Sequence, residues 1–188
     1  MMKKSAKYLD GVQVITLKTH FDIRGSFTEI FRKEWFKSLT PIQWNIVFSK
    51  KNALRGMRVH IKHTDYVVVF KGEGLYVLRD LRRGSPTEGK NCYIKLSGQP
   101  IKSIIIPPGV AHGFYFFKDS GYAYGVDYYH NEKDELRFHY LDPESSFRWP
   151  AKKPIIAKRD AALPPLKKII KKIPAWKPVS TKFLLASD

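Results

Sequence analysis

Short apolar runs separated by turn-forming residues fill the first 150 positions of the chain. The runs are rich in Val, Ile, Tyr and Phe, and Gly, Pro, Asn, Asp or Ser bounds each of them, which is typical of many short β-strands. The expected strands lie within residues 12–21, 42–49, 54–60, 66–70, 74–82, 92–98, 101–107, 113–117 and 122–130. They do not alternate with helical patterns, which argues against a doubly wound α/β fold. The pattern predicts an all-β sandwich or barrel.

Helical signals are confined to two short segments. Residues 32–39 indicate a short helix. In residues 166–173, leucine and isoleucine recur at the i, i+3, i+4, i+7 spacing of an amphipathic helix, and prolines stand on both sides. We expect a β-domain over residues 1–150 and a basic C-terminal extension over 151–188 whose helix packs on that domain.

The charge of the chain indicates an anionic partner. The net charge is +17, and residues 151–188 hold ten basic and two acidic side chains. Nucleic acid, an anionic membrane surface and phosphorylated metabolites all fit this charge. Because no nucleic-acid-binding motif accompanies it, we expect no nucleic-acid partner. The basic helix is interpreted as packed on the β-domain with its lysines in solvent, and membrane-surface binding is the alternative.

Composition narrows the class of protein further. Of all residues 43% are hydrophobic, yet no apolar run approaches the roughly 18 residues of a membrane span. The first residues lack the apolar run of a secretory signal. Cys92 is the single cysteine, which excludes an internal disulfide and a cysteine-based zinc site. These features predict a globular cytoplasmic protein without an integral membrane segment.

Two segments place arginine and histidine within expected strands. In "FDIRGSFTEIF", residues 21–31, Arg24 precedes a glycine, and an arginine at the mouth of a strand can fork onto a phosphate or carboxylate. In "LRGMRVH", residues 54–60, alternation places Arg58 and His60 on one face together with Leu54. The two ionisable side chains are therefore expected to point the same way.

A third segment, "IPPGVAHGF" over residues 106–114, forms a turn that delivers His112 into the next strand. Its Pro-x-Gly-x-x-His spacing resembles the second cupin motif. The first cupin motif reads His-x-His followed by a carboxylate, and Arg58-Val-His60 with Asp65 resembles it except for the first histidine. The β-domain over residues 1–150 thus resembles a cupin jelly-roll barrel.

Motifs from about residue 14 to about residue 166 resemble the dTDP-4-dehydrorhamnose 3,5-epimerase family in order and spacing. They read "FDIRGSFTEIF", "QWN", "KKNALRGMR", "DLRRGSPTEG", "KLSG", "IPPGVAHGF", "DYYH", "DPE…WP" and "AKRDAALPPL". The resemblance implies an enzyme acting on 4-keto nucleotide sugars in deoxysugar or surface-polysaccharide synthesis, including lipopolysaccharide. It also implies that no metal or other cofactor is needed, and a homodimer that exchanges strands.

The resemblance implies a substrate-binding set that this chain retains by position. His112 matches the histidine of the "AHGF" motif, and Asp160 matches the aspartate that orients the catalytic base. The binding residues are Arg24 and Arg55 for the diphosphate, Phe27, Glu29, Gln43 and Asn45 for the nucleotide and sugar, and Arg159 where the family usually has a lysine. An arginine-rich interior suits a diphosphate, whose charge is costly to bury unpaired.

The catalytic residues of the family match poorly. Arg58 stands in place of the proton-abstracting histidine, and a guanidinium cannot accept a proton at working pH. Asp65 is nearest to the position of the enolate-stabilising lysine. Ala123 occupies the position of the catalytic tyrosine, and alternation points its neighbours Tyr122 and Tyr124 to the opposite face.

The relocated-base hypothesis assigns proton abstraction to His60, with Arg58 and His112 steadying the enediolate oxygen. The "RGMRVH" segment is similar to the "RG-x-H-x-H" segment of the sugar 3,4-ketoisomerases, another cupin branch, and keeps the second of its two histidines. A keto-isomerase is therefore an alternative to an epimerase. The structural alternative for His60 is a hydrogen-bonded residue of the barrel.

Two further interpretations remain open. His60, Asp65 and His112 would make a two-histidine, one-carboxylate metal set, although the family resemblance favours no metal. A non-catalytic sugar-nucleotide binder would keep the diphosphate side intact, and an Arg58–Asp160 ion pair would hold the shape of its site.

The other histidines are not assigned a chemical role. Alternation predicts that His63 points away from His60 and lies at the surface. His20, His130 and His139 have no motif context and are expected to be structural.

Overall fold

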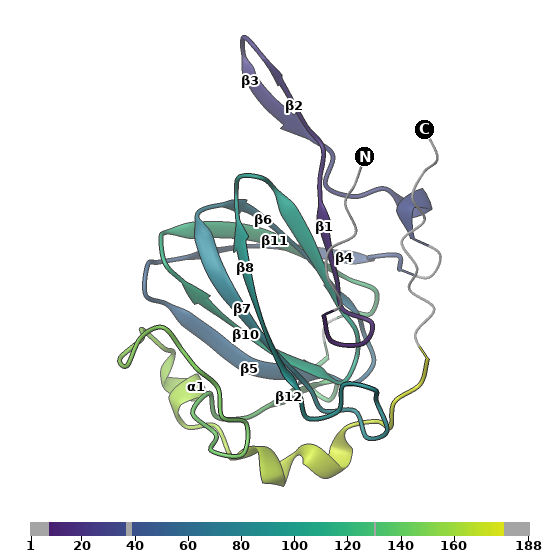
Figure 1. The fold of residues 1–188 in the computed structure, drawn as a ribbon, viewed down its shortest axis with the longest axis vertical. Helices are drawn as coiled ribbons and strands as arrows, with labels where there is room; N and C mark the ends of the chain where they lie inside the picture. Colours follow the sequence, from purple (N-terminus) through teal and green to yellow (C-terminus); the bar gives the residue numbers. More distant parts are fainter. Residues whose placement is uncertain (1–7, 37–38, 130, 179–188) are drawn as a thin grey trace.

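Two five-stranded antiparallel sheets face each other and form the barrel (Figure 1). The computed structural model describes residues 8–36, 39–129 and 131–178. The first sheet has the order β1 (Gln13–Thr16), β9 (Lys102–Ile106), β6 (Asp65–Lys71), β11 (Ser120–Val126) and β4 (Gln43–Ser49). The second sheet has the order β12 (Glu135–Arg137), β5 (Leu54–His60), β10 (Val110–Phe116), β7 (Glu73–Asp80) and β8 (Asn91–Ser97). The all-β prediction is confirmed, and each predicted run overlaps a strand.

The main core lies between the two sheets. The strands alternate, so every second side chain points into this space. The inward residues include Val67 of β6, Leu78 of β7, Ile104 of β9 and Phe116 of β10, all buried. The valine, isoleucine and aromatic runs of the sequence supply this core, which leaves the polar inward positions as candidates for a site.

The C-terminal extension covers the outer face of the second sheet. Leu166 and Ile169 are buried there against Met57, Val59 and other residues of that face. The predicted α-helix forms instead as two 3₁₀ turns, Leu166–Lys168 and Ile170–Lys172. The segment between the flanking prolines is too short for an independent α-helix, and the three-residue period of 3₁₀ turns lets Leu166 and Ile169 point the same way.

Helices are few and short in the described parts of the chain. Beside the two turns of the extension there are α1 (Lys158–Ala161) and the 3₁₀ turn η1 (Lys33–Trp35), where the short helix over 32–39 was predicted. Residues 37–38 of that segment and residues 179–188 of the extension lie outside the described ranges. None of the described helices has the length and apolar character needed to span a membrane.

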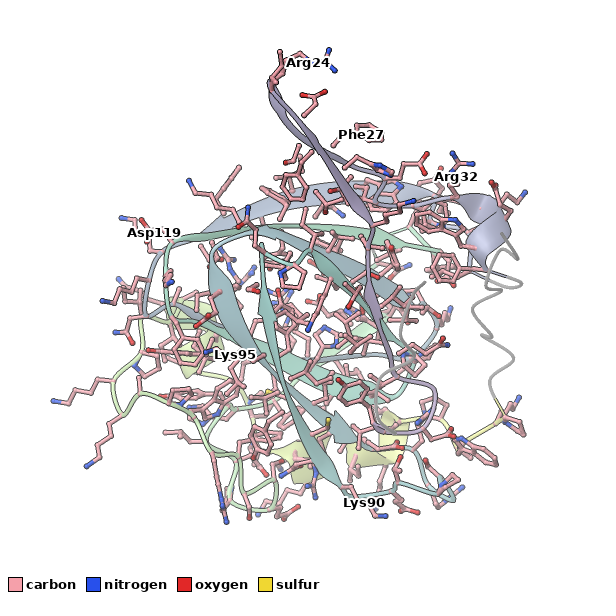
Figure 2. All side chains as sticks on the ribbon, turned by 45° about the horizontal axis from the view of Figure 1, so that its top comes forward. Arg24, Phe27, Arg32, Lys90, Lys95 and Asp119 are labelled. Carbon is pink, nitrogen blue, oxygen red and sulfur yellow. The ribbon has the colours of Figure 1, made fainter. Side chains whose placement is uncertain are left out.

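A hairpin arm projects from the barrel (Figure 1). It consists of β2 (Thr19–Asp22) and β3 (Gly25–Thr28), which pair only with each other. Arg24 at its tip and Phe27 on β3 extend into solvent, away from the interior of the barrel (Figure 2).

A bulge in β5 changes which of its residues share a face. Arg58 pairs with His112 and Arg55 pairs with Phe114, so three steps along β5 match two along β10. The predicted grouping of Leu54 with Arg58 is therefore wrong, because Leu54 packs with Met57 on the outer face. Gly56 permits this, since its φ is +124° and a Cβ there would stand 2.7 Å from the Cα of Gly113.

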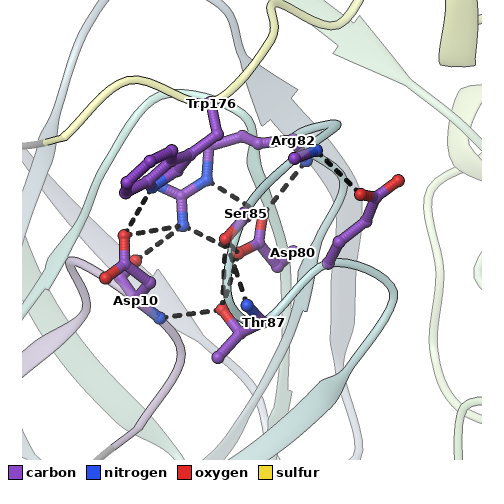
Figure 3. Close-up of polar contacts among 8 residues, drawn as sticks. Asp10, Asp80, Arg82, Ser85, Thr87 and Trp176 are labelled. Carbon is purple, nitrogen blue, oxygen red and sulfur yellow. Dashed lines mark hydrogen bonds and ion pairs between the residues drawn. The ribbon is translucent and has the colours of Figure 1, made fainter.

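The "DLRRGSPTEG" motif builds a buried polar network at one end of the barrel (Figure 3). Both oxygens of Asp80 accept hydrogen bonds, from the backbone and guanidinium of Arg82 and from the hydroxyls of Ser85 and Thr87. Arg82 Nη2 also donates to the carbonyl of Asp10, whose carboxylate accepts from Trp176 Nε1 at 2.6 Å. The network ties the N-terminal loop and the C-terminal extension to the barrel, which gives the motif a structural role.

Candidate active site

A pocket between the two sheets gathers most of the polar residues that point inward. It receives side chains from β4, β5, β6, β10, β11 and β12 and from the turn after β5. Its lining is Gln43, Asn45, Arg58, His60, His63, Asp65, Val67, His112, Phe114, Tyr122, Tyr124, Val126 and Glu135. Five of the predicted site residues, Gln43, Asn45, Arg58, His60 and His112, thus meet in one place.

Three imidazoles surround the Asp65 carboxylate. The Nε2 atoms of His60 and His112 lie 3.6 and 3.9 Å from Asp65 Oδ2, and Nε2 of His63 lies 3.7 Å from Oδ1. All four residues are buried. The metal set considered from the sequence, His60 with Asp65 and His112, is therefore assembled in space.

The prediction that His63 lies at the surface is wrong. Its ring is 4% exposed, and its Nδ1 lies 2.5 Å from Oδ2 of Asp134. The other oxygen of Asp134 accepts the backbone N–H groups of Ile61 and Lys62. This carboxylate holds the turn after β5, so the strand alternation ends at His60 and His63 turns inward.

The members of the cluster differ in the direction in which their pKa values are shifted. Burial lowers the pKa of His60 to about 4, and it also lowers the pKa of His112. For His63 burial acts in the same direction, but Asp65 and Asp134 outweigh it and raise the pKa. Burial would raise the pKa of Asp65, yet the three neighbouring histidines hold it well below its ordinary range.

Arg58 pairs with a residue that the sequence motifs did not indicate. Its Nη1 lies 3.7 Å from Oε2 of Glu135, and the side chain of Glu135 is also paired with Arg137. Asp160 is buried in α1, outside the pocket lining, and its neighbour Arg159 contacts it at 3.5 Å. The proposed Arg58–Asp160 ion pair is thus replaced by Arg58–Glu135, and an orienting role for Asp160 stays a prediction.

Tyr122 and Tyr124 face into the pocket, contrary to the sequence prediction. Tyr124 pairs across the strands with Asn45, and neighbours in this register share a face. Ala123, counted as the position of the catalytic tyrosine, points to the other side of β11. Burial raises the pKa of Tyr122 to about 12, so its hydroxyl keeps its proton at neutral pH.

Arg55 lies beside the pocket and is half-buried. Its Nε donates to the hydroxyl of Ser49 at 2.9 Å, and Nη2 donates to the carbonyl of Phe48 at 3.1 Å. On β4, Gln43 Nε2 donates to Asn45 Oδ1 at 3.3 Å, as expected for two residues that face the same way. These contacts fix polar groups at the side of the pocket next to β4.

The remaining predicted binding residues lie far from the pocket of their own chain. Arg24 is paired with Asp22 at 2.5 Å near the tip of the arm, and Phe27 is 64% exposed. Glu29, just after β3, is paired with Arg32 at 2.6 Å. The structure therefore divides the predicted binding set: Gln43 and Asn45 line the pocket with Arg55 beside them, Arg24, Phe27 and Glu29 belong to the arm and the residue after it, and Arg159 lies on α1.

Several pocket residues escaped the sequence interpretation. Asp134 follows its partner His63 by 71 positions, Glu135 follows its partner Arg58 by more than 70, and no motif marks either carboxylate. The pattern "HIKHTD" was the available signal for His63, because its imidazoles and carboxylate cluster within a few positions.

A two-sheet antiparallel barrel with histidines from β5 and β10 in its interior defines a cupin-type protein. A model of the family described as dTDP-4-dehydrorhamnose 3,5-epimerase matches residues 6–168, and the chain belongs to this family. The resemblance drawn from the motifs is thereby confirmed.

Individual relatives agree with the family assignment. A dTDP-4-dehydrorhamnose 3,5-epimerase from Neisseria gonorrhoeae is 35% identical over 162 residues, which are 82% of this chain and 49% of that protein. The chain thus spans about half the length of that relative. An enzyme of the same description from Mycobacterium tuberculosis is 30% identical, over 87% of each chain.

A solved structure shows the same fold. The dTDP-6-deoxy-D-glucose-3,5-epimerase from Legionella pneumophila, in complex with dTDP-4-keto-L-rhamnose, superposes with a TM-score of 0.87 at 30% identity. The match covers 94% of this chain and all of that one.

Proposed function

We propose that the protein moves a proton at a carbon next to the ketone of a 4-keto sugar carried on a nucleoside diphosphate. Epimerisation and keto-isomerisation are both included, because both pass through an enolate or enediolate. The observation that carries the proposal is the pocket itself: in a chain of this family, His60 enters it beside Arg58 and opposite Tyr124. A dTDP-sugar in deoxysugar or surface-polysaccharide synthesis, acted on in the cytoplasm, fits the family.

The pocket residues divide the reaction between the two sheets. His60 on β5 is the proposed base, because an imidazole can accept a proton and the guanidinium of Arg58 cannot. Arg58, held by Glu135, stabilises the negative charge that develops on the sugar oxygen, and His112 lies with it in the pocket lining. Tyr124, half-buried on the facing sheet, supplies a hydroxyl from the other side, where inversion of a carbon requires a proton.

Two copies of the chain complete the site in this proposal. The arm carries exposed apolar side chains, Phe21, Ile23 and Phe27, and the edge strand β4 exposes Ile46 and Phe48 on its outer face. Such patches favour association. The arm of one copy would bring Arg24, Phe27 and Glu29 to the pocket of its partner, where Arg24 and Arg55 hold the diphosphate.

Mixed dimers test this exchange. Arg24→Ala and His60→Gln are each expected to be inactive alone. After subunit exchange about a quarter of the sites would combine an intact pocket with an intact arm, so about a quarter of the wild-type activity returns. Light scattering would show a mass of two chains. No recovery, together with a monomeric mass, would contradict the exchanged dimer.

Solvent deuterium exchange tests the activity. Protein treated with a chelator is incubated in D₂O with 4-keto dTDP- and GDP-sugars, and the sugars are examined by NMR. Deuterium at C3 or C5 identifies an epimerase, and a shifted ketone identifies a keto-isomerase. Measurable binding without deuterium in any sugar would contradict the proposal.

The second candidate is a sugar-nucleotide binder without turnover. The observation that favours it is Arg58, which occupies the position of the family base and is tied to Glu135. On this alternative, binding without exchange is the expected result, and Arg58→His is not expected to create activity.

A further inference from the structure

We infer that the pocket binds a divalent transition-metal ion through His60, His112 and Asp65, with His63 on the second oxygen of Asp65. The ligand atoms of His60, Asp65 and His112 all lie within 4.8 Å of one another. Each residue comes from a different part of the fold, namely β5, β10, the start of β6 and the turn between β5 and β6. The three Nε2 atoms converge on one buried carboxylate.

Two of the imidazoles are oriented by contacts of their Nδ1 atoms, the ring nitrogens opposite those that face Asp65. His63 Nδ1 donates to Asp134 at 2.5 Å, and His112 Nδ1 donates to the carbonyl of Val110 at 3.4 Å. Both acceptors lack a proton to give, so the Nδ1 atoms carry the hydrogens and the Nε2 lone pairs face Asp65. A partner on the far ring nitrogen is the usual support of a metal-binding histidine.

The separations leave room for an ion. The Nε2 atoms lie 3.6–3.9 Å from the Asp65 oxygens, beyond hydrogen-bond distance. Ligand atoms held at about 2.1 Å from one metal are roughly 3.0–3.5 Å apart, so the nitrogen–oxygen separations contract by about half an ångström on binding, and the ligand atoms of the set all start within 4.8 Å of one another. His63 Nε2, which faces Asp65, is buried and without a hydrogen-bond partner, which is costly unless a ligand compensates for it.

The chemistry of the donors selects the ion. Imidazole nitrogens with one carboxylate suit Zn²⁺, Fe²⁺, Co²⁺ or Ni²⁺, and they are poor ligands for Mg²⁺ or Ca²⁺. The carboxylates of Asp134 and Glu135 lie around the cluster and offset the charge of Arg58. A site of this kind is expected to hold one ion per chain.

Metal binding and proton transfer compete for one atom. A metal on Nε2 of His60 occupies the lone pair that the proposed base needs, so the loaded protein loses exchange activity. This consequence rests on the proposed function, whereas the metal site itself rests only on the geometry.

The test titrates chelator-treated protein with Co²⁺, follows the visible absorption of the ion, and measures bound metal by elemental analysis. One Co²⁺ per chain is expected, together with a higher melting temperature. Affinity should fall at least tenfold in His60→Gln and Asp65→Asn, and about 10–100-fold in Asp134→Asn. His139→Gln, outside the pocket, is the matched control and should bind as the wild type does.

The metal site and the proposed function fail separately in this design. The absence of saturable uptake, or uptake that is unchanged in both His60→Gln and Asp65→Asn, overturns the metal site whatever the activity. Circular dichroism shows whether a variant folds, and for an unfolded variant the conservative His60→Asn takes its place. The deuterium-exchange activity of the metal-free protein is measured in a separate assay, and that assay tests only the proposed function.

Discussion

Two buried carboxylates of this barrel have opposite surroundings. Asp80, at the end of β7, accepts five hydrogen bonds between 2.5 and 3.0 Å, and both of its oxygens are used. Asp65, at the start of β6, faces three imidazole nitrogens at 3.6–3.9 Å. Both side chains are shielded from solvent, with 0% and 7% exposure. The two carboxylates therefore do not differ in burial. They differ in whether their oxygens are supplied with hydrogen bonds.

The difference separates a group that holds the fold from a group that serves a ligand. A saturated carboxylate such as Asp80 rigidifies its surroundings, and each lost partner leaves a costly orphan, as Arg82 Nη1 already is. The Asp65 cluster keeps nitrogen atoms without partners inside the barrel, which is unfavourable in itself. Local rules are commonly broken in this way at functional sites, where a substrate or ion supplies the missing contact.

Replacing His60 gives the largest expected effect and affects activity. His60→Gln should lower the rate of deuterium exchange by about 10²–10⁴-fold, the usual contribution of a general base. Its melting temperature should stay close to that of the wild type, because His60 has few partners to lose. Exchange at the wild-type rate would show that His60 is not the base, and His139→Gln provides the matched control.

Replacing Asp80 should affect stability instead. Asp80→Ala leaves the buried guanidinium of Arg82 with only its contacts to Asp10, of which the carboxylate is 3.9 Å away, and we expect the free energy of unfolding to fall by about 3–5 kcal/mol. Urea denaturation measures the loss. Glu144→Ala removes an exposed carboxylate without such contacts and should leave the midpoint unchanged; equal midpoints for the two variants would remove the contrast between the regions.

Acid should weaken the Asp80 network in a defined direction. Burial raises the pKa of Asp80, but Arg82, Ser85 and Thr87 outweigh it and hold the pKa below its ordinary value. The folded state thus binds the proton more weakly than the unfolded chain, and this stabilisation is complete above about pH 4. It should be lost as the pH falls through the folded pKa. Urea denaturation from pH 6 to pH 3 should show a shallower decline for Asp80→Asn than for the wild type.

The smallest effect is expected at the edge of the network. Trp176→Phe removes the hydrogen bond from the indole to Asp10 and keeps most of the apolar contact. The expected loss is about 1 kcal/mol in the free energy of unfolding, with unchanged exchange activity. A loss as large as that of Asp80→Ala would mean that Trp176 anchors the whole extension.

The sequence alone predicted most of the strands and five of the thirteen pocket-lining residues for clear physical reasons. Strand boundaries follow from apolar runs and turn residues, and the Pro-x-Gly-x-x-His turn placed His112 correctly. Arg58 and His60 share a face as predicted, because the bulge at Gly56 lies before both of them. The error fell on Leu54, on the other side of the bulge.

The missed parts depend on contacts between distant segments. His63 turns inward because Asp134 forms hydrogen bonds with its ring and with the backbone of the turn after β5. No feature of the sequence near residue 63 indicates this distant carboxylate. Counting motif positions placed Ala123 on the pocket side, whereas the pairing of β11 with β4 directs Tyr122 and Tyr124 there. Local periodicity likewise predicted an α-helix where two prolines leave space only for 3₁₀ turns.

The contact between His63 and Asp134 also bears on when the pocket comes into being. Eleven of the twelve described strands precede residue 134 in the chain and are synthesised before it. Until then the turn after β5 lacks its anchor, and Arg58 lacks its partner Glu135. In any order of folding, the interior therefore reaches its final arrangement only once segment 131–137 has docked on β5 and the turn that follows it.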